Sequence, residues 1–149
     1  MKLKFMVAVM AAFAFVFSAC DSKDAVNKQL VLYYSQTGST KVVAEEIQKM
    51  LDADIELIEL ENPYTGTYAE TLERVKQERE SGNLPALKPL KADLSKYEVI
   101  YLGYPIWFGT YALPIASLVK DHDFEGKKIV PFCTFGSGDL ESALEDLKK

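Results

Sequence analysis

Cysteine, histidine and tryptophan are all scarce in this sequence. Its 149 residues include two cysteines, one histidine and one tryptophan. Small secreted domains that depend on disulfides carry several cysteine pairs, so the distant Cys20 and Cys133 do not predict a disulfide framework. Cys133 ends a predicted strand, which favours a buried apolar role over a reactive thiol. His122 lies in a charged connection, and no pair of side chains suited to nucleophilic or acid–base catalysis stands out.

Positive charge is also in short supply. The chain has 17 Lys and Arg against 22 Asp and Glu, a net charge of −5. Two of the lysines, Lys2 and Lys4, belong to a segment that we expect to be removed, which leaves 15 basic against 22 acidic residues, or −7. Such a surface repels nucleic acid and attracts a basic partner protein. Nucleic-acid binding is therefore not expected. The hydrophobic fraction of 48% is enough for one core and a single domain.

The longest apolar run, residues 5–17, is too short to cross a membrane. As a helix it would extend roughly 20 Å, against a hydrocarbon thickness of about 30 Å. It follows a basic start that contains Lys2 and Lys4. A basic start and a short apolar core are typical of a secretory signal peptide.

The residues after this run, Phe17-Ser18-Ala19-Cys20, resemble the cleavage box of bacterial lipoproteins. The resemblance implies that residues 1–19 are a signal peptide and that Cys20 is acylated, which would attach the protein to a membrane of the bacterial cell envelope, on its periplasmic or surface side. Residues 20–28 are polar after the cysteine and are expected to form a tether. Ordinary cleavage, leaving a soluble periplasmic protein, is the alternative. The folded domain is expected over residues 29–149.

Short apolar runs and amphipathic stretches alternate through the rest of the chain. We expect strands at 30–34, 54–60, 97–103 and 128–133, and helices at 41–51, 68–80, 112–120 and 140–149. The alternation predicts an α/β fold of three layers, a doubly wound parallel sheet with helices on both faces. Ligands bind such sheets beyond the carboxyl ends of the strands. The loops after the first, third and fourth strands are therefore the candidate site.

The first loop, residues 35–40, has the composition of a phosphate site. It has the sequence SQTGST and opens a helix, so it combines four hydroxyl groups with a glycine at a helix N-terminus. Unpaired amides and the helix dipole favour an anion there. The loop lacks the glycine–lysine pair of a P-loop and the glycines of a dinucleotide site, which favours a mononucleotide. The simpler alternative is that Ser39 or Thr40 only caps the helix.

The second loop, residues 103–110, is unusually aromatic. Its sequence, GYPIWFGT, places Trp107 and Phe108 between two glycines. Exposed aromatic side chains held by a proline form a stacking surface for a flat ring. The alternative is that Trp107 and Phe108 fold into the core or against a partner.

The third loop, residues 134–138, has two glycines that let backbone amides face a ligand. Phe135 within it is placed to cover the edge of a ring. Glycine-rich turns are common, so the loop gains its significance from lying beside the other two.

Together these loops resemble the flavodoxins, through SQTGST after the first strand, GYPIWFGT after the third and FCTFGSG after the fourth. The likeness runs from about residue 30 to the C-terminus. It implies that FMN binds here, with its phosphate at residues 35–40, its isoalloxazine ring along 104–109 and the pyrimidine edge of that ring at 134–138. The candidate cofactor-binding residues are Ser35, Gln36, Thr37, Gly38, Ser39, Thr40, Tyr104, Pro105, Ile106, Trp107, Phe108, Gly109, Thr134, Phe135, Gly136 and Gly138.

One departure from the flavodoxin pattern concerns the end of the sheet. Flavodoxins usually have a fifth strand and a fifth helix, in the order 2-1-3-4-5, and this domain is expected to lack both. The strand at 128–133 would then form an edge, where Pro131 is better tolerated. Three explanations stay open: the sequence is a fragment, the gene is truncated, or the exposed edge pairs with a second copy to form a dimer.

The resemblance implies FMN-dependent electron transfer at the outer side of a bacterial membrane, to a redox partner protein or a quinone. The acidic surface favours a basic protein partner over an anionic nicotinamide cofactor. Two alternatives remain. One is an NAD(P)H-dependent FMN quinone reductase, and the other is a flavin-free binding lipoprotein that kept the fold.

Overall fold

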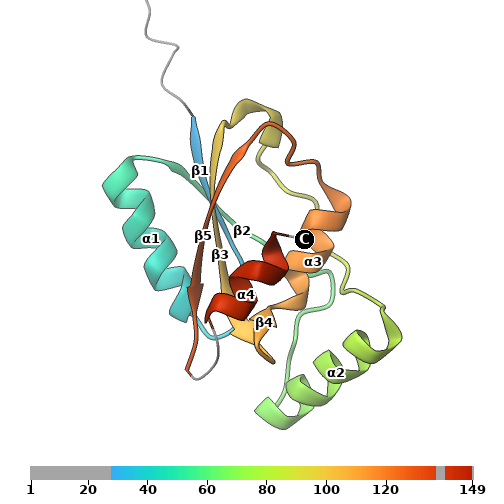
Figure 1. Cartoon of the computed structure of the whole chain (residues 1–149). Coiled ribbons are helices and arrows are strands. Elements are labelled where there is room, and N and C mark those ends of the chain that lie inside the picture. Colours follow the sequence, from blue (N-terminus) through green and yellow to red (C-terminus); the bar gives the residue numbers. More distant parts are fainter. Residues whose placement is uncertain (1–27, 137–139, 149) are drawn as a thin grey trace, which may run out of the picture.

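The computed structural model describes residues 28–136 and 140–148. The predicted signal peptide, Cys20 and Gly138 lie outside these ranges. A parallel sheet runs through the middle, with α1 on one face and α3 and α4 on the other (Figure 1). The elements in chain order are β1 (Gln29–Tyr33), α1 (Ser39–Leu51), β2 (Asp54–Leu57), α2 (Tyr68–Ser81), the 3-10 turn η1 (Leu94–Lys96), β3 (Val99–Trp107), β4 (Thr110–Tyr111), α3 (Leu113–Asp121), β5 (Lys128–Thr134) and α4 (Leu140–Leu147).

The predicted three-layer doubly wound α/β fold is confirmed. The four long strands are parallel and lie in the order β2-β1-β3-β5. Strand β5 is the fourth strand expected from the sequence, and among the described residues it pairs only with β3, as an edge strand would. Pro131 lies within it, opposite Leu102. A proline is tolerated at an edge because every second N–H of such a strand points away from the sheet.

The alternating side chains of β1 supply both hydrophobic cores. Leu30 and Leu32 are buried in the larger core, which includes Ile115 and Leu118 of α3. Val31 and Tyr33 point to the opposite face and pack in a smaller core with Ala44 of α1. This two-residue period is what a strand covered on both faces requires.

Two sequence predictions need correction. The expected strand at 54–60 ends at Leu57, and its continuation turns away so that Leu60 bridges Leu87 in an antiparallel pair. The second loop is largely not a loop, because β3 continues to Trp107 and turns through Phe108 and Gly109 into the short antiparallel strand β4. The chain can reverse direction here because Phe108 and Gly109 have φ values of 52° and 77°. Two consecutive positive φ angles are typical of a tight hairpin turn.

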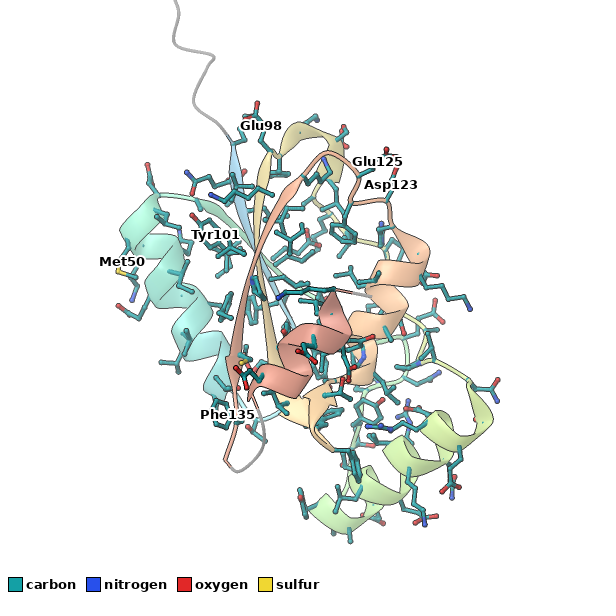
Figure 2. The ribbon with its side chains drawn as sticks, in the orientation of Figure 1. Met50, Glu98, Tyr101, Asp123, Glu125 and Phe135 are labelled. Atoms are coloured by element: carbon teal, nitrogen blue, oxygen red, sulfur yellow. The ribbon has the colours of Figure 1, made fainter. Side chains whose placement is uncertain are left out.

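The carboxyl ends of the parallel strands meet at one edge of the sheet. Figure 2 shows Phe135 at this edge, directly after β5, whereas Glu98, Asp123 and Glu125 lie at the opposite edge. The described part of the chain holds no helix that is both long and apolar enough to cross a membrane.

Gly103 of β3 makes room for an aromatic ring on the neighbouring strand. It pairs with Phe132 of β5, and a Cβ at position 103 would lie closer than 3.0 Å to atoms of the Phe132 ring. We therefore expect Gly103→Ala to displace that ring from the smaller core and to lower the free energy of unfolding by about 1–3 kcal/mol. Urea unfolding followed by circular dichroism measures this value.

The matched control for Gly103→Ala is the double variant Gly103→Ala/Phe132→Leu. Leucine removes the ring atoms that clash. Adding Gly103→Ala to Phe132→Leu should therefore lower the free energy of unfolding by less than adding it to the unchanged protein. Simple additivity of the two single changes would show that the ring and the missing side chain do not share the same space.

Candidate functional site

A cavity of about 850 Å³ opens at the carboxyl edge of the sheet, and we call it the main cavity. All three loops predicted from the sequence contribute to it. Its lining residues are Gln36, Thr37, Ser39 and Thr40 of the first loop, Pro105, Ile106, Trp107, Phe108 and Gly109 of the second, Thr134, Phe135 and Gly136 of the third, and Gly66, Tyr68, Thr71, Leu72 and Val75 from α2 and the turn before it.

The first loop presents unpaired donors to the main cavity. The hydroxyl of Ser35 accepts hydrogen bonds from the backbone N–H of Gly38 (3.2 Å) and of Lys41 (3.3 Å). Among the described residues, the recorded hydrogen bonds at this helix start involve the N–H groups of Gly38, Lys41 and Val42 and leave those of Ser39 and Thr40, in the first turn of α1, without a partner. Amides of this kind, at the positive end of a helix dipole, form an anion site.

The simpler reading of the first loop, a plain helix cap by Ser39 or Thr40, is wrong. The residue that precedes α1 is Gly38, with φ 94° and no side-chain cap. The buried hydroxyl of Thr40 instead forms a 2.8 Å hydrogen bond with the hydroxyl of Thr134. This bond ties the first loop to the third, so the two loops form one wall of the main cavity.

The second loop provides the aromatic wall, from a strand end rather than from a loop. Trp107 is half-buried and lines the cavity while it packs edge-on against Tyr34 and Tyr64, with ring centroids 5.8 and 5.5 Å apart. Phe108 is 54% exposed, and the guanidinium of Arg79 lies 5.4 Å from its ring centroid. Of the two alternatives, therefore, Trp107 combines core packing with the cavity wall, and Phe108 remains exposed at the rim.

Three of the predicted binding residues that the structure describes, Ser35, Gly38 and Tyr104, are not part of the lining. Ser35 accepts hydrogen bonds from the N–H groups of Gly38 and Lys41, and Gly38 forms the turn that precedes α1. Tyr104 is fully buried in β3 and packs edge-on against Tyr111, so its predicted contact with a ring is not available in this arrangement. Gly138 lies outside the described residues. The other twelve candidates line the main cavity.

Sequence reasoning missed the contribution of α2. This helix begins with a capping box in which Thr67 and Glu70 satisfy each other's backbone N–H groups. Its first turns place Tyr68, Thr71 and Leu72 at the main cavity, and Tyr68 is 79% exposed there. The turn-rich PYTGTY stretch before and at the start of α2 was the available signal.

The main cavity is electrically neutral among its described side chains. None of its described lining residues carries a formal charge, and the lining combines hydroxyl and amide groups with aromatic rings. Burial raises the pKa of the nearby Cys133 thiol, which agrees with the expectation of an unreactive cysteine. The described lining suits binding of a planar group that bears an anionic tail, and it includes no Asp, Glu, His, Lys or Cys side chain.

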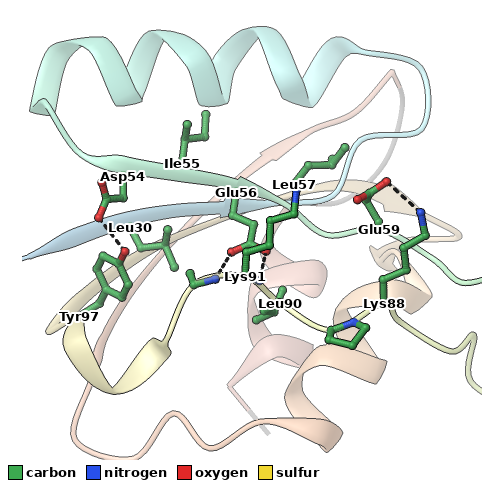
Figure 3. A pocket seen from close by; sticks show the side chains of 12 residues that line it. Leu30, Asp54, Ile55, Glu56, Leu57, Glu59, Lys88, Leu90, Lys91 and Tyr97 are labelled. Carbon is green, nitrogen blue, oxygen red and sulfur yellow. Dashed lines mark hydrogen bonds and ion pairs between the residues drawn. The ribbon is translucent and has the colours of Figure 1, made fainter.

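A second cavity, of about 640 Å³, lies along the outer edge of β2 (Figure 3). Its polar groups largely satisfy one another. The Glu56 carboxylate accepts hydrogen bonds from the backbone N–H groups of Lys91 and Ala92, both at 2.7 Å, and Tyr97 donates to Asp54 at 2.6 Å. The two bonds to Glu56 attach the 88–92 segment to the edge of the sheet. None of the binding residues predicted from the sequence lines this second cavity.

Comparison with known proteins identifies relatives of the domain. The family model described as flavodoxin matches residues 28–149. A proposed flavoprotein of Bacteroides eggerthii DSM 20697 is 31% identical, with a TM-score of 0.74 over 81% of this chain and 79% of that one. Its counterpart from Bacteroides uniformis ATCC 8492 is also 31% identical, with a TM-score of 0.74 over 82% and 81%.

A third solved structure supports the fold. It is a flavoprotein of Lactobacillus acidophilus NCFM in complex with FMN, which is 23% identical and has a TM-score of 0.75 over 82% of this chain and 84% of that one. Among proteins with curated descriptions, none matches this chain.

Proposed function

This chain belongs to the flavodoxin family, and from that premise we propose that its main cavity binds FMN and that the protein carries electrons through this cofactor. The supporting observation is that one cavity is lined both by the hydroxyl-rich first loop at the N-terminus of α1 and by the aromatic side chains of Trp107, Phe108 and Phe135. A flavoprotein of the same fold was solved with FMN.

The residues present fit FMN in the chemistry of their donors. The first loop can surround a terminal phosphate with N–H and O–H groups, and the positive φ of Gly38 brings the backbone close to it. The aromatic side chains of Trp107 and Phe135 suit stacking against or beside a flat ring. Bound FMN supplies one- and two-electron redox chemistry, and the chain's own residues hold it and exclude water.

The proposal favours an electron carrier over an NAD(P)H-dependent quinone reductase. Among the described residues no Lys or Arg lines the main cavity, and the nearest cation that contacts a lining residue is Arg79, 5.4 Å from the Phe108 ring centroid. The acidic surface, −7 after the expected cleavage, would attract a basic protein partner. Steady-state turnover with NADPH and a quinone should accordingly be close to the rate without enzyme, and rapid turnover would favour the reductase.

The purified protein is expected to be yellow and to release FMN on denaturation. After removal of the flavin, it should take up FMN far more tightly than riboflavin, because riboflavin lacks the phosphate that the first loop would hold. Titration followed by quenching of flavin fluorescence measures both affinities. A colourless protein that fails to bind added FMN would overturn the assignment, and equal affinities would remove the role of the first loop.

The proposal also places the domain at the outer side of a bacterial membrane, attached through a lipid on Cys20. Its support comes from the sequence alone, in the basic start, the short apolar run and the Phe17-Ser18-Ala19-Cys20 motif. A carrier held at the membrane would lie close to membrane-bound electron donors and acceptors.

A further inference from the structure

Tyr64 lies behind the main cavity and contacts three elements that contribute to its lining: the first loop, α2 and the end of β3. It stands in the turn between β2 and α2, and only 5% of it is exposed. Its ring, its hydroxyl and its backbone carbonyl each contact a different element. None of these contacts follows from the local sequence, because the partners are up to 43 residues away, as in the pair Tyr64–Trp107.

The hydroxyl and ring face of Tyr64 are held by α2. The hydroxyl donates to Glu78 Oε2 at 2.5 Å, and the guanidinium of Arg74 lies 4.3 Å from the ring centroid. Arg74 in turn bonds Glu78 Oε1 at 2.9 Å, so both carboxylate oxygens are occupied. Burial, with a further contribution from the bond to Glu78, raises the pKa of Tyr64, and its hydroxyl therefore stays a donor at neutral pH.

Arg74 extends this attachment to the turn itself. Its two terminal nitrogens donate to the backbone carbonyls of Pro63 and Asn62, each at 3.0 Å. A guanidinium bonded to a carboxylate and to two carbonyls has a fixed orientation, which a lysine could not reproduce. The turn and α2 are thus joined as one unit around Tyr64.

The backbone carbonyl of Tyr64 reaches the first loop. It accepts a 2.9 Å hydrogen bond from Gln36 Nε2, and Gln36 Oε1 accepts a 2.6 Å bond from the hydroxyl of Tyr34. Gln36 lines the main cavity. The expected phosphate end of the cavity is therefore tied to the same residue as α2.

Trp107 packs edge-on against both Tyr34 and Tyr64. Its ring meets Tyr34 at an interplanar angle of 89° and Tyr64 at 76°. Both are edge-to-face contacts, which fix the plane of an aromatic ring more sharply than simple burial does. Loss or displacement of either tyrosine would therefore remove one of the two contacts that orient the indole.

Helix α2 has little else to hold it. Of its fourteen residues only Val75 is buried, and in Figure 1 the helix stands apart from the rest of the molecule. Yet it contributes Tyr68, Thr71 and Leu72 to the lining of the main cavity. The polar contacts around Tyr64 are therefore a principal determinant of where this wall lies.

We propose that Tyr64 is a positioning residue that fixes the plane of Trp107 and joins α2 and the first loop into one preformed FMN site. This inference rests on the proposed function, because it names the support on which the same site is built. Tyr64 itself is not among the lining residues, so it acts through Trp107, Glu78 and Gln36. Preformed sites bind more tightly because fewer groups lose freedom on binding.

The test is Tyr64→Phe, which removes the hydroxyl and keeps the ring. The variant should bind FMN about tenfold more weakly. The near-ultraviolet circular dichroism of the flavin-free variant should also change in the tryptophan band, and this signal belongs to Trp107 alone because the chain has one tryptophan. The second readout does not require any bound cofactor.

The matched control is Tyr97→Phe. Tyr97 also donates to a carboxylate, Asp54 at 2.6 Å, but at the outer edge of β2 (Figure 3). This variant should keep both the FMN affinity and the tryptophan signal of the unchanged protein. Equal changes in both variants, or no change in Tyr64→Phe, would overturn the positioning role. If the unchanged protein takes up no FMN, the proposed function fails, and the tryptophan signal of the flavin-free variants still decides the role of Tyr64.

Discussion

Replacing Gly38 with aspartate is expected to weaken FMN binding by a hundredfold or more while the protein stays folded. The added carboxylate would lie at the N-terminus of α1, where the dianionic phosphate is expected. Two unit charges about 4 Å apart at an effective dielectric constant of about 20 repel by roughly 4 kcal/mol, and a hundredfold loss corresponds to about 2.7 kcal/mol. Fluorescence titration with FMN measures the effect.

The fold should tolerate this change for two reasons. A Cβ at position 38 meets no atom within 4 Å, and Asp accepts positive φ better than most residues. An acidic side chain before a helix is also favourable for the helix itself. The backbone at Gly38, with φ 94°, still strains any side chain, so the unfolding midpoint in urea should fall by the equivalent of about 1–2 kcal/mol while the transition stays cooperative.

Gly38→Asn separates charge from shape. Asparagine matches aspartate in size and in backbone preference but carries no charge, so it should cost tenfold in affinity at most. Equal losses in the two variants would mean that the backbone at Gly38 matters and the charge does not. Undiminished binding in Gly38→Asp would remove the phosphate from the first loop.

Replacing Cys20 with serine is expected to release the protein from the membrane fraction. Two or more acyl chains on one residue anchor a protein stably, because each buried methylene contributes about 0.8 kcal/mol, and serine offers no thiol for the first acyl transfer. The full chain, expressed in a bacterium, should move from the detergent-extracted to the soluble fraction. Incorporation of labelled fatty acid should disappear with it.

The chain carries its own control in its other cysteine. Cys133→Ser should leave both the membrane fraction and the fatty-acid label unchanged, because Cys133 lies within β5. A Cys20→Ser protein that remains with the membranes would show that another segment attaches it. An unchanged protein that is soluble and unlabelled would point to ordinary signal cleavage.

The parts of the fold that follow from local pattern were predictable. The continuous apolar run of β1 and the alternation of strands with helices are properties of neighbouring residues. The rule that ligands bind at the carboxyl ends of parallel strands then located the main cavity without further information. Twelve of the sixteen predicted binding residues line it.

The parts that depend on tertiary contacts were not predictable. Pro105 and the aromatic run suggested a loop, but β3 continues through Pro105 by pairing with β5 and through Trp107 by pairing with β4. Tyr104 belongs to the larger core with Ile100 and Leu102, because β3 continues past Gly103 and keeps its two-residue alternation. Helix α2 has only one buried residue, Val75. Its apolar side chains Tyr68, Leu72 and Val75 share one helix face and line the main cavity, but the sequence alone does not tell what that face packs against.

The turn at Phe108 and Gly109 has a consequence for any attempt to make this protein more heat-resistant. A two-residue turn with positive φ at both positions prefers asparagine followed by glycine, and a bulky residue held in that backbone region costs about 1–2 kcal/mol. A screen for thermal tolerance alone would therefore favour Asn at position 108. Its most robust survivors would have exchanged an exposed aromatic side chain at the rim of the main cavity for a small amide.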